Sequence, residues 1–98
     1  MATHIFDIDG TLVEYHTSKW LPSALEMLKE LYKAGDQIIL VTMRGKQDEG
    51  TDWSIENTDL LLKDIGIPYT ILYSVSSPRY MHDDSKGAFL HHKTNESW

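Results

Sequence analysis

The sequence predicts an α/β fold, a small three-layer parallel sheet of about four strands with helices on both faces. Three observations predict it. Short apolar runs alternate with longer segments of helical periodicity. Such alternation produces right-handed crossovers, which place parallel strands in one sheet and the helices outside it. Polar residues follow the apolar runs, at the sheet edge where open α/β folds place their active sites.

The first half of the chain contains two expected strands and one helix. The first strand covers about His4 to Ile8, and a polar and aromatic loop follows it. Apolar residues at helical spacing then predict a helix from about Pro22 to Ala34. The second strand covers Gln37 to Thr42, and its unbroken apolar core is typical of a strand buried on both faces.

The second half continues the alternation. A helix is expected from about Trp53 to Ile65, and a third strand from Pro68 to about Tyr73. Arg79 to His82 is expected to form a short fourth strand, and Ala88 to His91 a short helix. We expect residues 1–98 to form one domain that ends in a polar tail at about residues 92–98. The sequence does not determine the strand order.

Composition excludes several classes of function. The chain has no cysteine, so a disulfide framework and a thiolate zinc site are both excluded. Its formal charge is −6, which does not favour a nucleic-acid partner. It lacks a signal-peptide pattern and the roughly 18-residue apolar run of a membrane span. We therefore expect a cytoplasmic protein without a membrane partner.

The most informative stretch is the carboxylate pair Asp7 and Asp9, which ends the first apolar run and is followed by Gly10. On a strand, residues two apart point to the same side. Two carboxylates this close require a positive group between them. One carboxylate can attack phosphorus, and the other can move protons between the leaving oxygen and water. The pair therefore predicts a phosphoryl-transfer site.

Other strand ends carry complementary groups. Thr42 ends the second strand and can donate a hydrogen bond to a phosphate oxygen. Asp83 and Asp84 end the expected fourth strand. Since parallel strands end at one edge, the acidic pairs predict an oxygen-rich Mg²⁺ site. Bound Mg²⁺ would offset the repulsion between the carboxylates and draw charge from the phosphoryl group.

These motifs resemble those of the haloacid dehalogenase superfamily, in the order in which that family carries them. The resemblance spans roughly residues 4 to 85 and implies a Rossmann-like core. It implies Asp7 as the nucleophile that forms an aspartyl-phosphate, and Asp9 as the general acid/base. Mg²⁺ would be held by Asp7, the Asp9 backbone carbonyl, Asp83 and Asp84. The phosphate would be bound by Gly10, Thr42, Met43 and a cationic side chain.

The cationic residue is where the sequence departs from the family. Its third motif is a lysine or arginine shortly before the second acidic pair, and Ser77-Pro78 stands where small members often have Lys-Pro. The nearest cations are Arg79 and Lys86. We favour Arg79, because it precedes the fourth strand and a guanidinium matches phosphate oxygens, and Lys86 is the alternative.

Spacing also indicates that the site lacks a cap domain. The segments 11–37 and 42–79 are too short to contain one. An open site suits a bulky phosphorylated substrate or closure by a second subunit, as in a homo-oligomer. Small capless members carry a Thr-x-Arg-Gly segment like that at residues 42–45, and they include proteins labelled as capsular-polysaccharide biosynthesis phosphatases. Arg44 in this segment is more often a solvated loop charge than a substrate contact.

The sequence predicts a Mg²⁺-dependent phosphomonoester hydrolase of phosphatase type. Two alternatives remain open. One is a catalytically weak or inactive phosphate-binding or regulatory domain on the same scaffold. The other is a nucleic-acid 3′-end phosphatase, a substrate class that the acidic charge balance disfavours. A phospho-acceptor receiver domain fits less well, because its acceptor ends the third strand, where this chain has Tyr73-Ser74.

Overall fold

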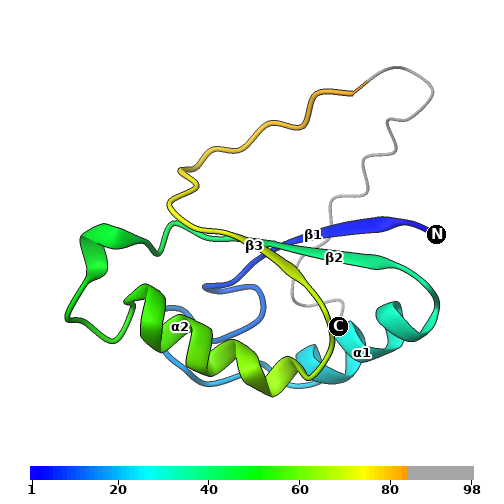
Figure 1. Ribbon diagram of the computed structural model, residues 1–98, viewed down its shortest axis with the longest axis horizontal. Helices are drawn as coiled ribbons and strands as arrows, with labels where there is room; N and C mark the ends of the chain where they lie inside the picture. The colour runs from blue at the N-terminus through cyan, green and yellow to red at the C-terminus, as the bar shows by residue number, and fades with distance from the viewer. Residues whose placement is uncertain (84–98) are drawn as a thin grey trace.

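The computed structural model describes residues 1–83, and its centre is a parallel sheet of three strands (Figure 1). The strands are β1 (Thr3–Asp7), β2 (Gln37–Val41) and β3 (Thr70–Leu72), in the order β1-β2-β3. Asp7 is the register partner of Val41, and Val41 is the partner of Leu72. The three carboxyl ends therefore lie side by side, as the sequence predicts.

Two helices connect the strands. They are α1 (Ala24–Lys33) and α2 (Ile55–Leu62), and two short 3₁₀ helices, η1 (Lys46–Asp48) and η2 (Lys63–Ile65), flank α2. Both helices predicted within residues 1–83 are present, although each is shorter than expected. Ser54 begins α2 by accepting a hydrogen bond of 3.1 Å from the Asn57 amide, which satisfies one of the open donors of the first turn.

Both helices lie on the same face of the sheet (Figure 1). Because the strand order advances in one direction, two right-handed crossovers place both helices on one side. The α/β class and the parallel sheet are confirmed, but residues 1–83 form two layers where three were expected. On the opposite face Ile5 is 45% exposed and Leu72 is 51% exposed, so these strands are not buried on both sides.

The hydrophobic core lies between the sheet and the helices. Alternation along β1 and β2 directs Phe6, Ile38 and Leu40 into it. Helix α1 adds Ala24 and Leu28. The core continues beyond the strands, where it includes Ile8, Leu12, Val13, Leu62 and Ile65. Because the loop that carries Asp9 is anchored on both sides by buried residues, the core determines where that carboxylate lies.

The expected fourth strand at residues 79–82 does not form, so the described sheet has three strands rather than about four. This segment is exposed, with Tyr80 at 78% and Met81 at 53%. A parallel crossover needs about a dozen residues or more. Residues 73–78, which follow β3, are too few to return the chain to the start of the sheet.

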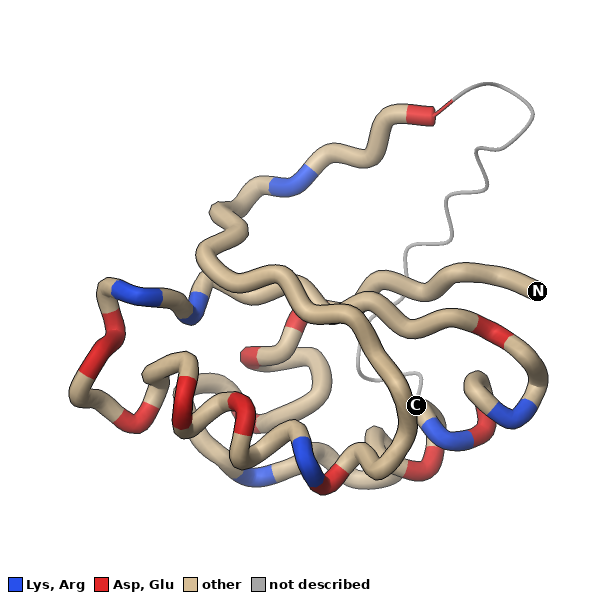
Figure 2. Tube along the Cα trace, in the orientation of Figure 1, with Lys and Arg blue, Asp and Glu red and all other residues tan. Residues whose placement is uncertain are grey.

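Several expectations fall on residues beyond the described range 1–83. These are the short helix at residues 88–91, the tail at 92–98, and the side chains of Asp84 and Lys86. In the described part of the chain, no helix has the length and apolar character needed to cross a membrane. Lys and Arg are scattered along the described trace rather than gathered in one stretch (Figure 2).

Candidate active site

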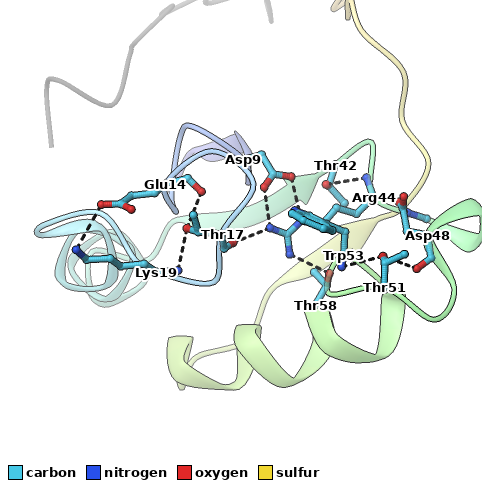
Figure 3. Close-up of polar contacts among 11 residues, drawn as sticks. Asp9, Glu14, Thr17, Lys19, Thr42, Arg44, Asp48, Thr51, Trp53 and Thr58 are labelled. Atoms are coloured by element: carbon cyan, nitrogen blue, oxygen red, sulfur yellow. Dashed lines mark hydrogen bonds and ion pairs between the residues drawn. The ribbon is translucent and has the colours of Figure 1, made fainter.

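A two-pronged polar contact at the carboxyl edge joins Asp9 to Arg44 (Figure 3). Arg44 Nε donates to Asp9 Oδ2 at 2.9 Å, and Arg44 Nη2 donates to Asp9 Oδ1 at 2.7 Å. This two-pronged geometry is the strong form of an arginine–carboxylate pair, because both oxygens are held in one plane. The Arg44 side chain is 3% exposed and that of Asp9 is 18% exposed, so water screens the pair weakly.

Arg44 also joins two further elements. Its Nη1 donates to Thr58 Oγ1 on α2 at 3.1 Å, and its Nη2 donates to the Thr17 carbonyl oxygen at 3.0 Å (Figure 3). The expectation of a solvated loop charge is therefore wrong. A guanidinium can be buried here because its partners compensate for the lost hydration. The signal in the sequence was the position of Arg44, two residues after a strand end that faces an acidic pair.

Thr42 lies at the expected place, one residue beyond the end of β2, and it is fully buried. Its Oγ1 accepts a hydrogen bond of 3.1 Å from the Arg44 amide. Thr42 thus helps to shape the turn that directs Arg44 toward Asp9. Met43, the neighbouring expected phosphate-binding residue, is 54% exposed at the same edge.

Gly45 allows the chain after β3 to pack against this loop. A Cβ atom at Gly45 would lie 2.0 Å from Ser74 Oγ and 3.1 Å from Ser74 Cβ, so any larger residue would have to displace the Ser74 side chain. The Ser74 amide donates to the Arg44 carbonyl at 2.9 Å, and the Val75 amide donates to the Thr42 carbonyl at 2.8 Å. The pairing of β2 with β3 therefore continues into the loops of the site.

The turn after β1 is built on Gly10. Its φ of 77° is in the left-handed region, which glycine enters without steric penalty. The Gly10 amide donates to the Val13 carbonyl at 2.9 Å, so this expected phosphate donor is used inside the turn. Strand β1 ends at Asp7 and Ile8 forms a bend, so the alternation that predicted a shared side for Asp7 and Asp9 stops between them.

Asp7 pairs with a different arginine. Arg79 Nη1 lies 3.2 Å from Asp7 Oδ1, and the two side chains are 28% and 33% exposed. Arg79 Nη2 also donates to the Val75 carbonyl at 3.0 Å. Arg79, rather than another cation of residues 1–83, is the residue that the structure brings to the carboxylate expected to act as nucleophile.

The expected metal ligands are hard oxygen donors, a type that fits Mg²⁺. Within residues 1–83, however, no three Asp, Glu or His side chains come close enough together to hold a metal ion. Asp9 was expected to contribute its backbone carbonyl, which leaves its carboxylate available for Arg44. The fourth expected ligand, Asp84, lies outside the described residues.

Aromatic residues cover the loop beside the site. The rings of Tyr15 and His16 have centroids 4.1 Å apart, and those of His16 and Trp53 are 5.4 Å apart. Tyr15 is 70% exposed and lies close to Gly10. Trp20 Nε1 donates to Asp64 Oδ2 at 3.1 Å, which ties the end of the loop to η2. Trp20 and Trp53 thus hold the loop against the helical layer.

Tyr73 links the carboxyl end of β3 to helix α2. It follows β3, and its hydroxyl donates to the Asp59 carboxylate on α2. Burial, and then the hydrogen bond and negative charge of Asp59, raise the pKa of Tyr73 above its ordinary value. The neutral hydroxyl therefore persists in the folded protein and links β3 to α2.

The sequence of this chain matches a family described as haloacid dehalogenase-like hydrolase over residues 4–59. The chain belongs to this family. The match covers all but the first residue of β1, all of α1 and β2 and most of α2, and so includes Asp7, Asp9, Thr42 and Arg44. Neither the search of curated proteins nor that of solved structures found a match. Family membership confirms the expected hydrolase scaffold, whereas Arg79 and Asp83 lie beyond the matched residues.

Proposed function

We propose that the protein is a Mg²⁺-dependent phosphomonoester hydrolase that works through an aspartyl-phosphate on Asp7. The observation that carries this proposal is the position of Asp7 at the carboxyl end of β1, with a guanidinium nitrogen of Arg79 3.2 Å away. The carboxylate is one-third exposed, so a phosphoryl group can reach it. An anionic nucleophile needs such a cation to bring a phosphate dianion close.

In the first half of the proposed reaction, Arg79 and the loop after β2 bind the phosphoryl oxygens. Asp7 Oδ attacks phosphorus and the bond to the ester oxygen breaks. Asp9, which enters this step in its protonated form, gives its proton to the departing alkoxide. In the second half, water attacks phosphorus and its proton passes to Asp9. The bond between phosphorus and Asp7 Oδ breaks, inorganic phosphate leaves, and both carboxyl groups return to their starting states.

Mg²⁺ would be held by Asp7, the Asp9 backbone carbonyl, Asp83 and Asp84. When bound, it would draw negative charge from the phosphoryl group and so favour attack by an anion. Asp7 therefore has two proposed positive neighbours, the ion and Arg79.

We further propose that the site is open and takes a bulky phosphorylated substrate. The connection from β1 to α1 consists of the loop around residues 8–23, and that from β2 to α2 consists of a loop with one short 3₁₀ helix. The ring of Tyr15 in the first loop lies beside Gly10, and the ring of His16 packs against that of Tyr15. A larger substrate, or a second subunit, would supply the exclusion of water that a cap supplies elsewhere.

The direct test is release of phosphate from p-nitrophenyl phosphate in the presence of Mg²⁺. Wild-type protein should turn over, chelation should abolish turnover, and Asp7→Asn should lower kcat by at least about a thousandfold. Acid-quenched wild-type protein should carry phosphate in an acyl linkage at Asp7. Activity that persists in Asp7→Asn, or that ignores a chelator, would exclude this mechanism.

One observation favours a second candidate, a phosphate-binding domain without turnover. Both carboxylate oxygens of Asp9 accept hydrogen bonds from Arg44, and this arrangement restrains the proposed proton carrier. Such a domain would show a Mg²⁺-dependent rise in Tm with beryllofluoride and would release no phosphate from any ester. Turnover above that of Asp7→Asn would exclude it.

A further inference from the structure

We propose that Arg44 is a positioning residue that holds the Asp9 carboxylate in the orientation needed to receive the proton of the attacking water. This inference rests on the proposed phosphatase function and concerns its second half-reaction. Arg44 is the residue on which the carboxylate, the loop after β1 and helix α2 converge (Figure 3).

The first argument is geometric. Both carboxylate oxygens of Asp9 are bound, at 2.9 Å and 2.7 Å, by two nitrogens of one planar group. A carboxylate held at two points cannot rotate about its terminal bond without losing a short contact. The orientation of Asp9 is therefore set by where the guanidinium lies.

The second argument is that the guanidinium itself cannot move freely. Thr58 Oγ1 on α2 fixes Nη1, and the Thr17 carbonyl accepts from Nη2. Thr58 is fully buried and belongs to a helix that begins with a capped turn. Through Arg44 the buried helical layer positions Asp9, in the way that supporting hydrogen bonds position catalytic groups generally.

The third argument distinguishes Arg44 from a substrate ligand. Its side chain is 3% exposed and its hydrogen bonds go to residues of this chain. Arg79, by contrast, is 28% exposed and lies against the nucleophile. The charge available to a phosphoryl group thus comes from Arg79, and Arg44 acts on the reaction through Asp9.

The test uses Arg44→Lys, which keeps the charge but cannot make the two-pronged contact. With p-nitrophenyl phosphate the leaving group departs without a proton, so formation of the phospho-enzyme does not need Asp9. Breakdown does. We expect kcat to fall roughly 10- to 100-fold while kcat/KM changes less than about threefold, so KM falls with kcat. Phosphate should accumulate on Asp7.

A structural role alone predicts a different result. If Arg44 only held the fold together, a smaller fraction of the purified Arg44→Lys protein would be active. The apparent kcat and kcat/KM would then fall together, and KM would be unchanged. That outcome would overturn the inference, as would a wild-type kcat in Arg44→Lys. Absence of turnover in the wild type would overturn the phosphatase proposal as well, so the two failures are distinguishable.

Two further variants complete the experiment. Lys29→Gln removes a charge from an exposed position on α1, outside the candidate site, so its kinetics should match those of the wild type. Thr58→Val removes one support of the guanidinium, and it should lower kcat in the same direction as Arg44→Lys but less. In Arg44→Ala, added methylguanidinium should restore part of kcat. Failure of both Thr58→Val and the rescue to change kcat would count against the inference.

Discussion

The two aspartates of the site are held by two arginines in very different ways. Arg44 is buried, binds Asp9 at two points and is itself fixed by Thr58. Arg79 approaches Asp7 at 3.2 Å, from an exposed segment that follows β3 and belongs to no strand. The structure therefore holds the carboxylate proposed to move protons in a fixed position and leaves the proposed nucleophile more accessible. The family match ends at residue 59, so it covers the first half and not the Arg79 segment.

The largest expected difference is in folding stability. Arg44→Met should lower the free energy of unfolding by about 3 kcal/mol, because it leaves the Asp9 carboxylate without its partner. Arg79→Met should cost less than about 1 kcal/mol, because that pair is more exposed to solvent. Urea unfolding followed by tryptophan fluorescence measures both. Equal losses of stability in the two variants would show that burial does not make the Arg44–Asp9 pair stronger than the Arg79–Asp7 pair.

Substitution of Thr58 tests how much its hydrogen bond to Arg44 contributes to the stability of the protein. Thr58→Val keeps the shape of the side chain but removes the acceptor of a charged donor in a buried place, so unfolding should become easier by about 2 kcal/mol. Thr70→Val changes an exposed strand residue in the same way and should stay within about 0.5 kcal/mol of the wild type. A small effect at Thr58 would show that water replaces the lost contact.

Arg79 can be tested through substrate binding. If it supplies the positive charge near Asp7, Arg79→Ala should lower kcat/KM about tenfold, mainly by raising KM, which corresponds to about 1.4 kcal/mol. A lysine introduced as Ser77→Lys in that variant should recover part of the loss. Lys86→Ala provides the comparison, and a larger effect there would assign the role to Lys86 instead.

The smallest expected effect concerns Tyr73. Tyr73→Phe removes the hydrogen bond to Asp59 and should cost about 1 kcal/mol at neutral pH. The pKa of Tyr73 is raised above its ordinary value of 10.0 in the folded state. Its stabilising contribution is therefore complete below about pH 10 and is lost as the pH rises toward the folded-state value.

Urea unfolding at several pH values measures this effect. The stability of the wild type should fall more steeply above about pH 10 than that of Tyr73→Phe. Tyr80→Phe, at a ring that is 78% exposed, should stay within about 0.5 kcal/mol of the wild type at neutral pH. Parallel alkaline curves for the wild type and Tyr73→Phe would show that Tyr73 ionises alike in both states.

Much of the fold could be predicted from the sequence because it depends on local patterns. Apolar runs specify β1, β2 and β3, and helical spacing specifies α1 and α2, each within a few residues of the observed bounds. The turn at Gly10 follows from a backbone conformation that glycine enters readily. The same patterns place Asp7 and Thr42 at neighbouring strand ends, because parallel strands end at a common edge.

The sequence by itself therefore determined the parallel α/β class, the acidic pair at the carboxyl edge and the resemblance to the family. Only the tertiary structure decided the strand order, and with it the placement of both helices on one face. It also decided that Arg44 is buried against Asp9 and that Arg79 reaches Asp7. The physical reason is range: periodicity acts over a few residues, whereas Asp9 and Arg44 are 35 residues apart in the chain. They meet because β1 and β2 are neighbours in the sheet, with Asp7 paired to Val41, so the loops that follow these strands lie side by side.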